Sequence, residues 1–237
     1  MKYILEYIWL GGNYEMRSKI KVHETEKSIQ HNYLKNVPAW NYDGSSTAQA
    51  SGEHSEIKLL PVAVYRNPLF ESPSSALASL LVLCETRDHN GHPLVTNNRF
   101  KANEIFEKCK DQEPWFGLEQ EYFILNDSTT SLLQHSAVTQ GQYYCSVGGR
   151  NAYFRKIVDK HMLACIDAGL TISGTNAEVC LSQWEYQIGP CVGIDSGDQM
   201  WVARYLLEKI RRGGGLLHRV ASQAVCRSQR QWLPYQF

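Results

Sequence analysis

Residues 114–122 read PWFGLEQEY, and this stretch decides how the middle of the chain folds. The apolar character continues beyond it, so residues 118–125 predict a β-strand. Glu119 and Glu121 lie two positions apart on this strand. Because side chains alternate between the two faces of a strand, we expect both carboxylates to point to the same face.

Two further glutamates lie in segments rich in strand-forming residues. Glu178 lies in GTNAEV at residues 174–179, and Glu185 lies in QWEYQIGP at residues 183–190. Carboxylates gathered inside a fold repel one another unless a cation neutralises them. Hard divalent ions such as Mg²⁺ and Mn²⁺ accept such oxygen ligands. Isolated charged residues are usually exposed, so spacing alone favours solvent-facing glutamates and supports a metal site only as a hypothesis.

The first hundred residues are rich in strand signals. Residues 3–10 are followed by the turn Gly11-Gly12-Asn13 and the alternating segment 17–22, which together predict a hairpin. Residues 57–65 and 80–85 predict two more strands. These signals indicate a small β domain over residues 1–100, and a boundary near residue 100 separates it from an α/β domain over residues 101–237.

The second part of the chain mixes helix and strand signals. Residues 101–111 and 151–168 carry apolar side chains at helical spacing, with Gly169 suited to the C-cap of the second helix. Asp198 predicts the N-cap of a third helix, which carries Trp201, Tyr205 and Leu206.

The charge balance and the cysteines exclude several classes of function. Lys plus Arg and Asp plus Glu number 24 each, so nothing attracts nucleic acid or an anionic membrane surface. No apolar run reaches the roughly 18 residues that a membrane span needs. Residues 1–10 carry Glu6 and lack a small-residue cleavage site, which indicates a strand and not a secretory signal. The seven cysteines contain no CxxC pair, which is typical of reduced thiols in a cytoplasmic protein.

The strings around the four glutamates resemble the metal-binding segments of eukaryotic-type glutamine synthetases. PWFGLEQEY at 114–122 resembles the segment with that family's first two metal ligands, and GTNAEV with QWEYQIGP resembles the segments with the next two. WNYDGSST at 40–47 resembles the family's loop that reaches into the active site of a neighbouring subunit. The strings YYCSVG at 143–148 and WVAR at 201–204 match as well, and all follow the family's order over roughly residues 5 to 210.

This resemblance implies an α+β fold, with a small N-terminal β-grasp domain followed by a truncated α/β glutamine synthetase catalytic domain. It also implies the ATP-dependent ligation of ammonia to L-glutamate, which gives L-glutamine through a γ-glutamyl phosphate. The implied cofactors are ATP and Mg²⁺ or Mn²⁺, and the substrates are glutamate and ammonia. The family forms rings with active sites between subunits, so the resemblance further implies a homo-oligomer, by family a decamer.

The resemblance assigns roles to particular residues. Glu121, Glu178 and Glu185 would hold one metal, and Glu119 would belong to the metal that accompanies ATP. Asp43 would bind ammonium and take its proton, with Ser46 close by, although both residue types are also common in ordinary turns. The remaining implied nucleotide contacts are Trp115, Glu185, Tyr186, Gln187, Ile188, Gly189 and Pro190, of which Trp115 is equally compatible with a core position.

Three features depart from the family. The chain starts late and lacks the family's N-terminal helical arm, and residues 126–142 lack its Gly-Trp-Pro loop. Residues 211–237 read RRGGGLLHRVASQAVCRSQRQWLPYQF, where the family's glutamate-binding loop, metal-binding His and Glu, and phosphate-binding Arg residues are not identifiable. Permitted codons for residues 219–237, read from the second base, give EWQAKPYAGHSGNGCHTN, which resembles the absent segment. We therefore expect a frameshift in this tail, and a genuine divergent tail is the alternative. If the tail is genuine, we expect low turnover, because several charged groups of the family's active site are then absent.

Two alternatives to the ligase stay open. A non-catalytic relative of glutamine synthetase would assemble or regulate without ATP-dependent turnover. A guanidino kinase would share a related catalytic fold, but the Glu-Gln-Glu and Asn-Ala-Glu strings argue against it.

Overall fold

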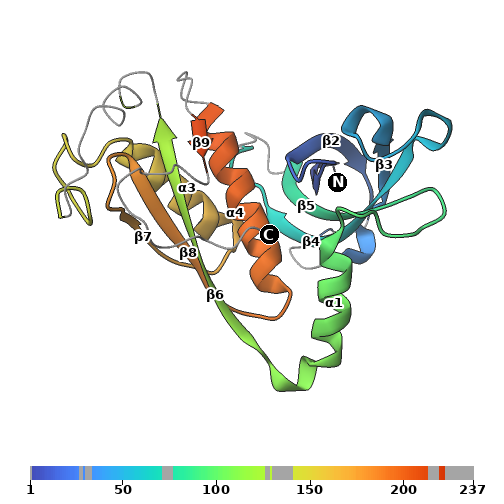
Figure 1. Cartoon of the computed structure of the whole chain (residues 1–237). Coiled ribbons are helices and arrows are strands. Elements are labelled where there is room, and N and C mark those ends of the chain that lie inside the picture. Colours follow the sequence, from blue (N-terminus) through green and yellow to red (C-terminus); the bar gives the residue numbers. More distant parts are fainter. Residues whose placement is uncertain are drawn as a thin grey trace.

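Two β-sheets form the framework of the described structure. The computed structural model describes residues 2–26, 29, 34–70, 77–125, 129, 141–212 and 219–221. A five-stranded sheet, sheet A, has the order β2-β1-β5-β4-β3, and a four-stranded sheet, sheet B, has the order β7-β8-β6-β9 (Figure 1). The strands are β1 (Lys2–Leu10), β2 (Met16–Glu24), β3 (Trp40–Asp43), β4 (Glu56–Arg66), β5 (Leu77–Arg87), β6 (Trp115–Leu125), β7 (Ile172–Ala177), β8 (Gln183–Val192) and β9 (Arg219–Ala221). The helices are α1 (Asn98–Lys108), α3 (Arg155–Ala168) and α4 (Asp195–Arg212), with short 3₁₀ turns η1 (Leu34–Asn36), η2 (Gly44–Thr47), η3 (Gly52–His54) and η4 (Lys110–Gln112).

Strand β1 lies inside sheet A and explains the apolar start of the chain. It pairs antiparallel with β2, which confirms the predicted hairpin, and parallel with β5 on its other edge. Tyr7 and Ile8 are both fully buried, although adjacent side chains of a strand point to opposite faces. A strand covered on both faces reads as a nearly continuous apolar run, because neither face needs polar residues.

Glu6 interrupts that run and is bound by residues from distant parts of the chain. Its carboxylate is buried and accepts hydrogen bonds from Lys209 Nζ at 2.6 Å, Tyr205 Oη at 2.6 Å and Asn67 Nδ2 at 2.9 Å. A buried charge is tolerated when it is paired and hydrogen-bonded. This contact therefore ties sheet A to α4.

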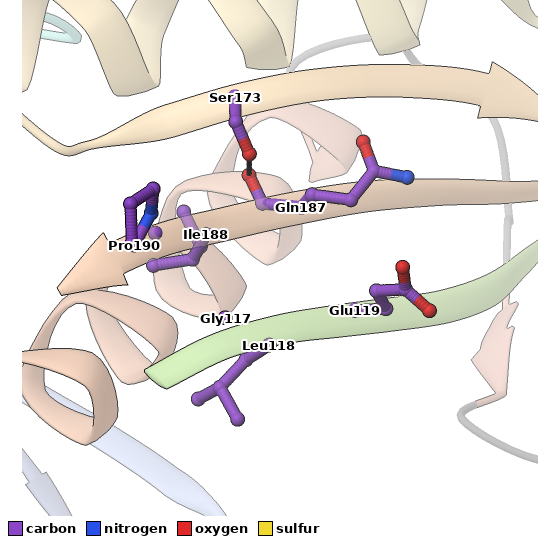
Figure 2. Close-up of a pocket in the computed structure, with 8 residues that line it drawn as sticks. Gly117, Leu118, Glu119, Ser173, Gln187, Ile188 and Pro190 are labelled. Carbon is purple, nitrogen blue, oxygen red and sulfur yellow. Dashed lines mark hydrogen bonds between the residues drawn. The ribbon is translucent and has the colours of Figure 1, made fainter. Parts of the chain in front are cut away.

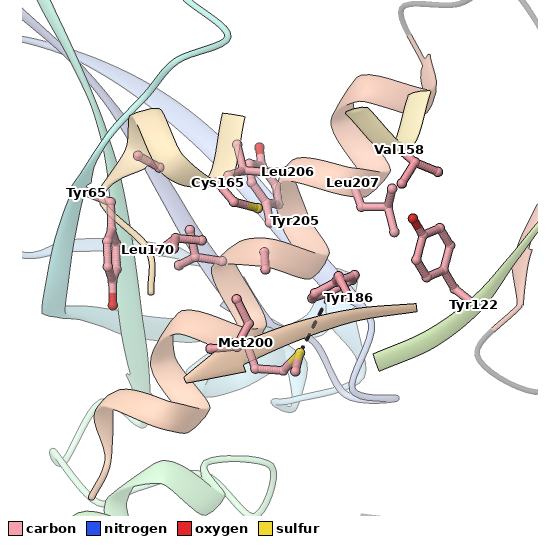
Figure 3. Close-up of a cluster of buried hydrophobic side chains, with 14 of the residues drawn as sticks. Tyr65, Tyr122, Val158, Cys165, Leu170, Tyr186, Met200, Tyr205, Leu206 and Leu207 are labelled. Atoms are coloured by element: carbon pink, nitrogen blue, oxygen red, sulfur yellow. Dashed lines mark hydrogen bonds between the residues drawn. The ribbon is translucent and has the colours of Figure 1, made fainter. Parts of the chain in front are cut away.

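Helices α3 and α4 form a layer between the two sheets (Figure 1). Their apolar side chains join residues of both sheets in one hydrophobic cluster, which includes Ile8 of β1, Val158 of α3, Leu206 of α4 and Tyr186 of β8 (Figure 3). The predicted boundary near residue 100 falls in α1, yet this cluster spans both sides of it. A second cluster covers the other face of sheet A and includes Tyr7, with Tyr3, Leu5, Trp9 and Leu59.

The helix predictions hold for the elements but not for every boundary. Gly169 adopts a left-handed conformation with φ of 84° and caps α3, as predicted. Asp198, predicted as an N-cap, lies inside α4, which begins at Asp195. Its backbone N–H already donates to Ile194, and its carboxylate binds Arg99 instead of capping the helix. Ile105, one of the apolar residues at helical spacing in the segment 101–111, is 60% exposed, so this spacing does not place it in the core.

The expected α+β class is confirmed. Backbone hydrogen bonds pair β9, within the tail at 211–237, with the end of β6. Residues 213–218, 222–237 and most of the predicted irregular segment 126–142 lie outside the described residues. No helix in the described ranges is both long and apolar enough to cross a bilayer.

Candidate active site

The pairing of β6 with β8 gathers acidic and amide side chains on one face of sheet B. Glu121 lies opposite Glu185, and Glu119 lies opposite Gln187. Register partners share a face, so these four side chains lie on the same side of the sheet. The alternate residues of β8, such as Tyr186, are buried in the core beneath α4. Glu119 and Glu121 therefore lie on the same face of the sheet, as their spacing along the strand predicted.

Strand β7 adds Glu178 to this face. Asn176 of β7 lies opposite Glu185, and a tight connection then returns the chain into β8. The backbone N–H of Glu178 donates to the Gln183 carbonyl at 2.9 Å, which closes that connection. The Glu178 carboxyl group consequently lies within hydrogen-bonding reach of Glu185.

Amide side chains hold the carboxylates. Gln187 Nε2 donates to Glu185 Oε1 at 2.6 Å and to Asn176 Oδ1 at 3.0 Å. Asn176 Nδ2 donates to Glu178 Oε1 at 3.1 Å, and Gln183 Nε2 donates to Glu121 Oε2 at 2.7 Å. Each of these three glutamates thus has at least one carboxylate oxygen fixed by an amide donor.

The electrostatics of the three glutamates favour a positive charge. Burial, a hydrogen bond with Glu185 and repulsion from Glu185 and Glu121 raise the pKa of Glu178 to about 7. Burial and repulsion from Glu185 and Glu119 also raise the pKa of Glu121. Like charges that crowd one another make ionisation costly, and a bound cation would relieve that cost.

These carboxylates are close but are not assembled into a coordination sphere. Within the described ranges, no group of three or more His, Cys, Asp or Glu side chains is arranged to hold a metal ion. The oxygen-only donor set and the crowding of negative charge nevertheless fit Mg²⁺ or Mn²⁺. The ligand set Glu119, Glu121, Glu178 and Glu185 therefore stays a prediction.

A hollow of about 430 Å³ adjoins the carboxylates (Figure 2). It is lined by Gly117, Leu118, Glu119, Ser173, Gln187, Ile188, Gly189 and Pro190. Figure 2 shows that Glu119 and Gln187 come from neighbouring strands beside this space. Five of the residues predicted to contact a nucleotide thus line one hollow.

Gly189 is required where β8 approaches the start of β6. Its φ is 118°, and a Cβ at this position would lie 2.6 Å from the Phe116 carbonyl oxygen. A residue with a side chain would therefore be strained in conformation and would also collide with β6. The glycine permits the close approach of β8 to the irregular start of β6.

Two predicted nucleotide contacts do not face the hollow with their side chains. Tyr186 is fully buried, and its hydroxyl donates to Met200 Sδ at 3.5 Å in the core (Figure 3). Trp115 is the first residue of β6 and is 69% exposed, so it is not the core residue that the sequence also allowed. Glu185, the third contact outside the hollow, belongs to the carboxylate group.

Asp43 and Ser46 lie in a separate place, at the end of β3 in sheet A. Asp43 Oδ1 accepts from Ser45 N at 3.0 Å and Ser45 Oγ at 2.7 Å, and Oδ2 accepts from Ser46 Oγ at 2.8 Å. These hydrogen bonds lower the pKa of Asp43 to about 2, so it stays an exposed anion. It lines an open hollow of about 320 Å³ with Lys19 and Glu56, among others. Figure 1 shows β3 and sheet B on opposite sides of the chain, so one chain does not join the two groups.

Residue patterns alone did not identify Asn176 and Gln183, nor the contact of Gln187 with Glu185. The sequence did contain a signal for them. Gly174 and Asn176 are two residues apart on one strand, and so are Glu185 and Gln187 on the next, so pairing of the strands places the amides and the carboxylate on one face.

Comparisons with known proteins agree with this architecture. No family model matches the chain. A putative glutamine synthetase of Acanthamoeba polyphaga mimivirus is 53% identical over 209 residues, which cover 87% of this chain and 58% of the viral protein. The chloroplastic glutamine synthetase of Brassica napus is 45% identical over 221 residues, covering 90% of this chain and 50% of the plant protein.

Solved structures agree at the level of fold. A Plasmodium falciparum glutamine synthetase structure matches with a TM-score of 0.62 and 14% identity, over 92% of this chain and 46% of that one. The chain spans about half to three-fifths of the length of the curated relatives described above. Over about nine-tenths of its own length, the chain is therefore similar to curated proteins named glutamine synthetase, at 45–53% identity.

Proposed function

We propose that this chain carries the divalent-cation and ATP sites of a glutamate–ammonia ligase. The observation that supports the proposal is the gathering of Glu121, Glu178 and Glu185 on one face of sheet B, beside the hollow that Gln187 lines. The names of the curated relatives point to the same chemistry, the synthesis of glutamine from glutamate and ammonia.

The residues divide into groups by what each would do. Glu121, Glu178 and Glu185 would hold one Mg²⁺ or Mn²⁺, and Glu119 would face the metal that accompanies ATP. The cations would supply charge neutralisation for the phosphates during transfer to the γ-carboxylate of glutamate. Asp43, ionised above a pH of about 2, would bind ammonium and accept its proton, with Ser46 fixing the carboxylate.

The nucleotide would occupy the hollow between β6 and β8. Pro190 offers an exposed apolar ring, the backbone of Ile188 and Gly189 borders the same space, and Glu119 and Gln187 provide polar contacts. Trp115 and the backbone of Tyr186 would border the same nucleotide from outside the hollow. In this arrangement the phosphates would lie next to the carboxylate group.

The separation of Asp43 from the carboxylates supports a site shared between two copies. The Asp43 group lies on sheet A and the carboxylates on sheet B, on opposite sides of one chain. A homo-oligomer, a decamer by analogy with the family, would bring the Asp43 loop of one copy to the carboxylates of the next. We also propose a cytoplasmic location, since the described cysteines are free thiols.

The experiment measures binding and turnover separately. Isothermal titration calorimetry with Mn²⁺ tests the wild-type chain against Glu185→Gln, with Glu107→Gln, an exposed glutamate of α1, as the matched control. We expect Mn²⁺ binding that Glu185→Gln weakens and Glu107→Gln leaves unchanged. Equal affinities in all three proteins would refute the metal site.

Turnover distinguishes the ligase from its non-catalytic alternative. A hydroxamate-forming assay with ATP, Mg²⁺, glutamate and hydroxylamine measures acyl transfer, because hydroxylamine displaces phosphate from the γ-glutamyl phosphate, and light scattering measures assembly. Hydroxamate formation that Asp43→Asn abolishes supports the ligase. Assembly into rings without any ATP-dependent turnover supports a relative that assembles or regulates without catalysis.

A further inference from the structure

Gln187 and Asn176 lie between the two innermost carboxylates of the candidate site. Strands β7 and β8 pair so that Gly174 lies opposite Gln187 and Asn176 lies opposite Glu185. The two amides are thus diagonal neighbours on one face of the sheet, with Glu185 beside them and Glu178 at the end of β7. Their position follows from the strand register and does not depend on a bound ion.

A continuous series of hydrogen bonds connects the Glu185 carboxylate to the Glu178 carboxylate through the two amides. Gln187 Nε2 uses its two N–H groups on Glu185 Oε1, at 2.6 Å, and Asn176 Oδ1, at 3.0 Å. Asn176 Nδ2 then donates to Glu178 Oε1 at 3.1 Å, while Val179 N donates to Glu178 Oε2 at 3.0 Å. Each amide therefore directs an N–H group toward a carboxylate, Gln187 toward Glu185 and Asn176 toward Glu178.

Gly174 provides the space in which the Gln187 amide lies. A Cβ at Gly174 would lie 2.8 Å from Gln187 Oε1, closer than a side chain tolerates without displacement. The glycine has no left-handed φ, so the conformation of the backbone does not require it. The missing side chain therefore serves the amide that crosses over it.

We propose that Gln187, relayed by Asn176, is a positioning residue that sets the spacing of the Glu178 and Glu185 carboxylates for a divalent cation. The inference rests on the proposed function, because it names the side chains that would orient the ligands of that site. Gln187 also lines the adjoining hollow, so one side chain contacts both the ligand group and the space proposed for the nucleotide. Groups that orient metal ligands typically change metal affinity by roughly 10- to 100-fold when removed.

The first test is the affinity of the full chain for Mn²⁺, followed by electron paramagnetic resonance of the free ion. Gln187→Met keeps the side-chain length and removes both donors, and Gln112→Met, at an exposed glutamine of η4, is the matched control. We expect Gln187→Met to bind Mn²⁺ about 10- to 100-fold more weakly and Gln112→Met to bind it like the wild type. Equal affinity of the two variants would overturn the proposal.

Gly174→Ala tests the geometry without removing any polar group. Its Cβ would displace the Gln187 amide, so we expect weaker Mn²⁺ binding, and no further loss when it is combined with Gln187→Met. Gly52→Ala, where an added Cβ meets nothing within 4 Å, is the matched control. Additive losses in the double variant would show that Gly174 acts independently of Gln187 and would contradict the mechanism.

A metal-free readout separates this inference from the proposed function. In crystal structures without metal, Gln187→Met is expected to move the Glu178 and Glu185 carboxylates apart relative to the wild type. If both carboxylates keep their positions, Gln187 does not position them, whatever the metal affinity. If instead the wild-type chain binds no Mn²⁺ while the carboxylates do move, the proposed metal function fails and the positioning role remains.

Discussion

Removing Arg99 should cost the chain a large part of its stability. Arg99 Nε and Nη2 donate to the two oxygens of Asp198 at 2.7 and 2.8 Å, and Nη1 donates to Glu85 Oε1 at 2.8 Å. Asp198 is 3% exposed and Glu85 is 6% exposed. Arg99→Ala would therefore leave the buried Asp198 carboxylate without its cation, while Glu85 would keep only the longer contact with Arg87 Nη2, at 3.4 Å.

The expected loss in the free energy of unfolding is worked out from the removal of the cationic partner, and not from adding the energies of the three hydrogen bonds. Charge-assisted hydrogen bonds contribute about 1.5–3 kcal/mol each, but these three share one guanidinium and are not additive. Breaking a buried ion pair by removing one partner costs about 3–5 kcal/mol, because a charge is left buried and uncompensated. We expect Arg99→Ala to lower the free energy of unfolding by that amount, out of the roughly 5–15 kcal/mol typical of a domain.

Urea unfolding followed by tryptophan fluorescence measures this loss. Arg17→Ala is the matched control, since Arg17 pairs with Glu15 at the surface and both side chains are 37% exposed. Such exposed pairs contribute about 0–1 kcal/mol. The double variant Arg99→Ala/Asp198→Asn should be more stable than Arg99→Ala alone, because the uncompensated charge at Asp198 is removed. A loss below about 1 kcal/mol for Arg99→Ala, no larger than that for Arg17→Ala, would refute the reasoning.

Three further predictions concern pH, a buried hydroxyl and thiol reactivity. Because the pKa of Glu178 is raised from 4.5 to about 7, the folded metal-free chain keeps a proton that the unfolded chain has lost between these values. This group's contribution to stability therefore falls as pH rises through that window, and Glu178→Gln should make the slope shallower in chelator-treated protein, although Glu121, whose pKa is also raised, contributes to the remainder; an unchanged slope would contradict the assignment. Tyr205→Phe removes a donor to the buried Glu6 carboxylate, so urea unfolding should show a loss of about 1.5–3 kcal/mol, and a change within error would count against the contact. Iodoacetamide, read out by peptide mass spectrometry, should label the exposed Cys145 in the native chain and spare Cys165, which is buried and whose pKa is raised to about 12. Equal labelling of the two thiols would show that the native packing of α3 is looser than described.

Local patterns predicted the parts of the fold that local physics decides. The turn Gly11-Gly12-Asn13 between two strand-forming runs predicted the hairpin of β1 and β2, and Gly169 predicted the end of α3. The spacing of Glu119 and Glu121 predicted a shared face, because alternation is a property of any strand. Each of these predictions needs only residues that are close in the sequence.

Contacts between distant residues explain what the sequence did not show. Asp198 has the chemistry of an N-cap, but its carboxylate is bound by Arg99, which lies 99 positions earlier. Glu6 interrupts an apolar run for a reason found only 203 positions later, at Lys209. Tertiary partners override local propensity in both cases, and no window of sequence contains both members of either pair.

The candidate site is a consequence of how β8 meets the core. Trp184, Tyr186 and Ile188 are buried in the layer shared with the helices, so the period of two leaves Glu185 and Gln187 on the opposite face. Shifting the register of β8 by one residue would place those carboxylate and amide groups in the core and expose three large apolar side chains. Hydrophobic burial therefore fixes which residues of β8 can contact a ligand, and the amides of Gln187 and Asn176 then set where the carboxylates lie on that face.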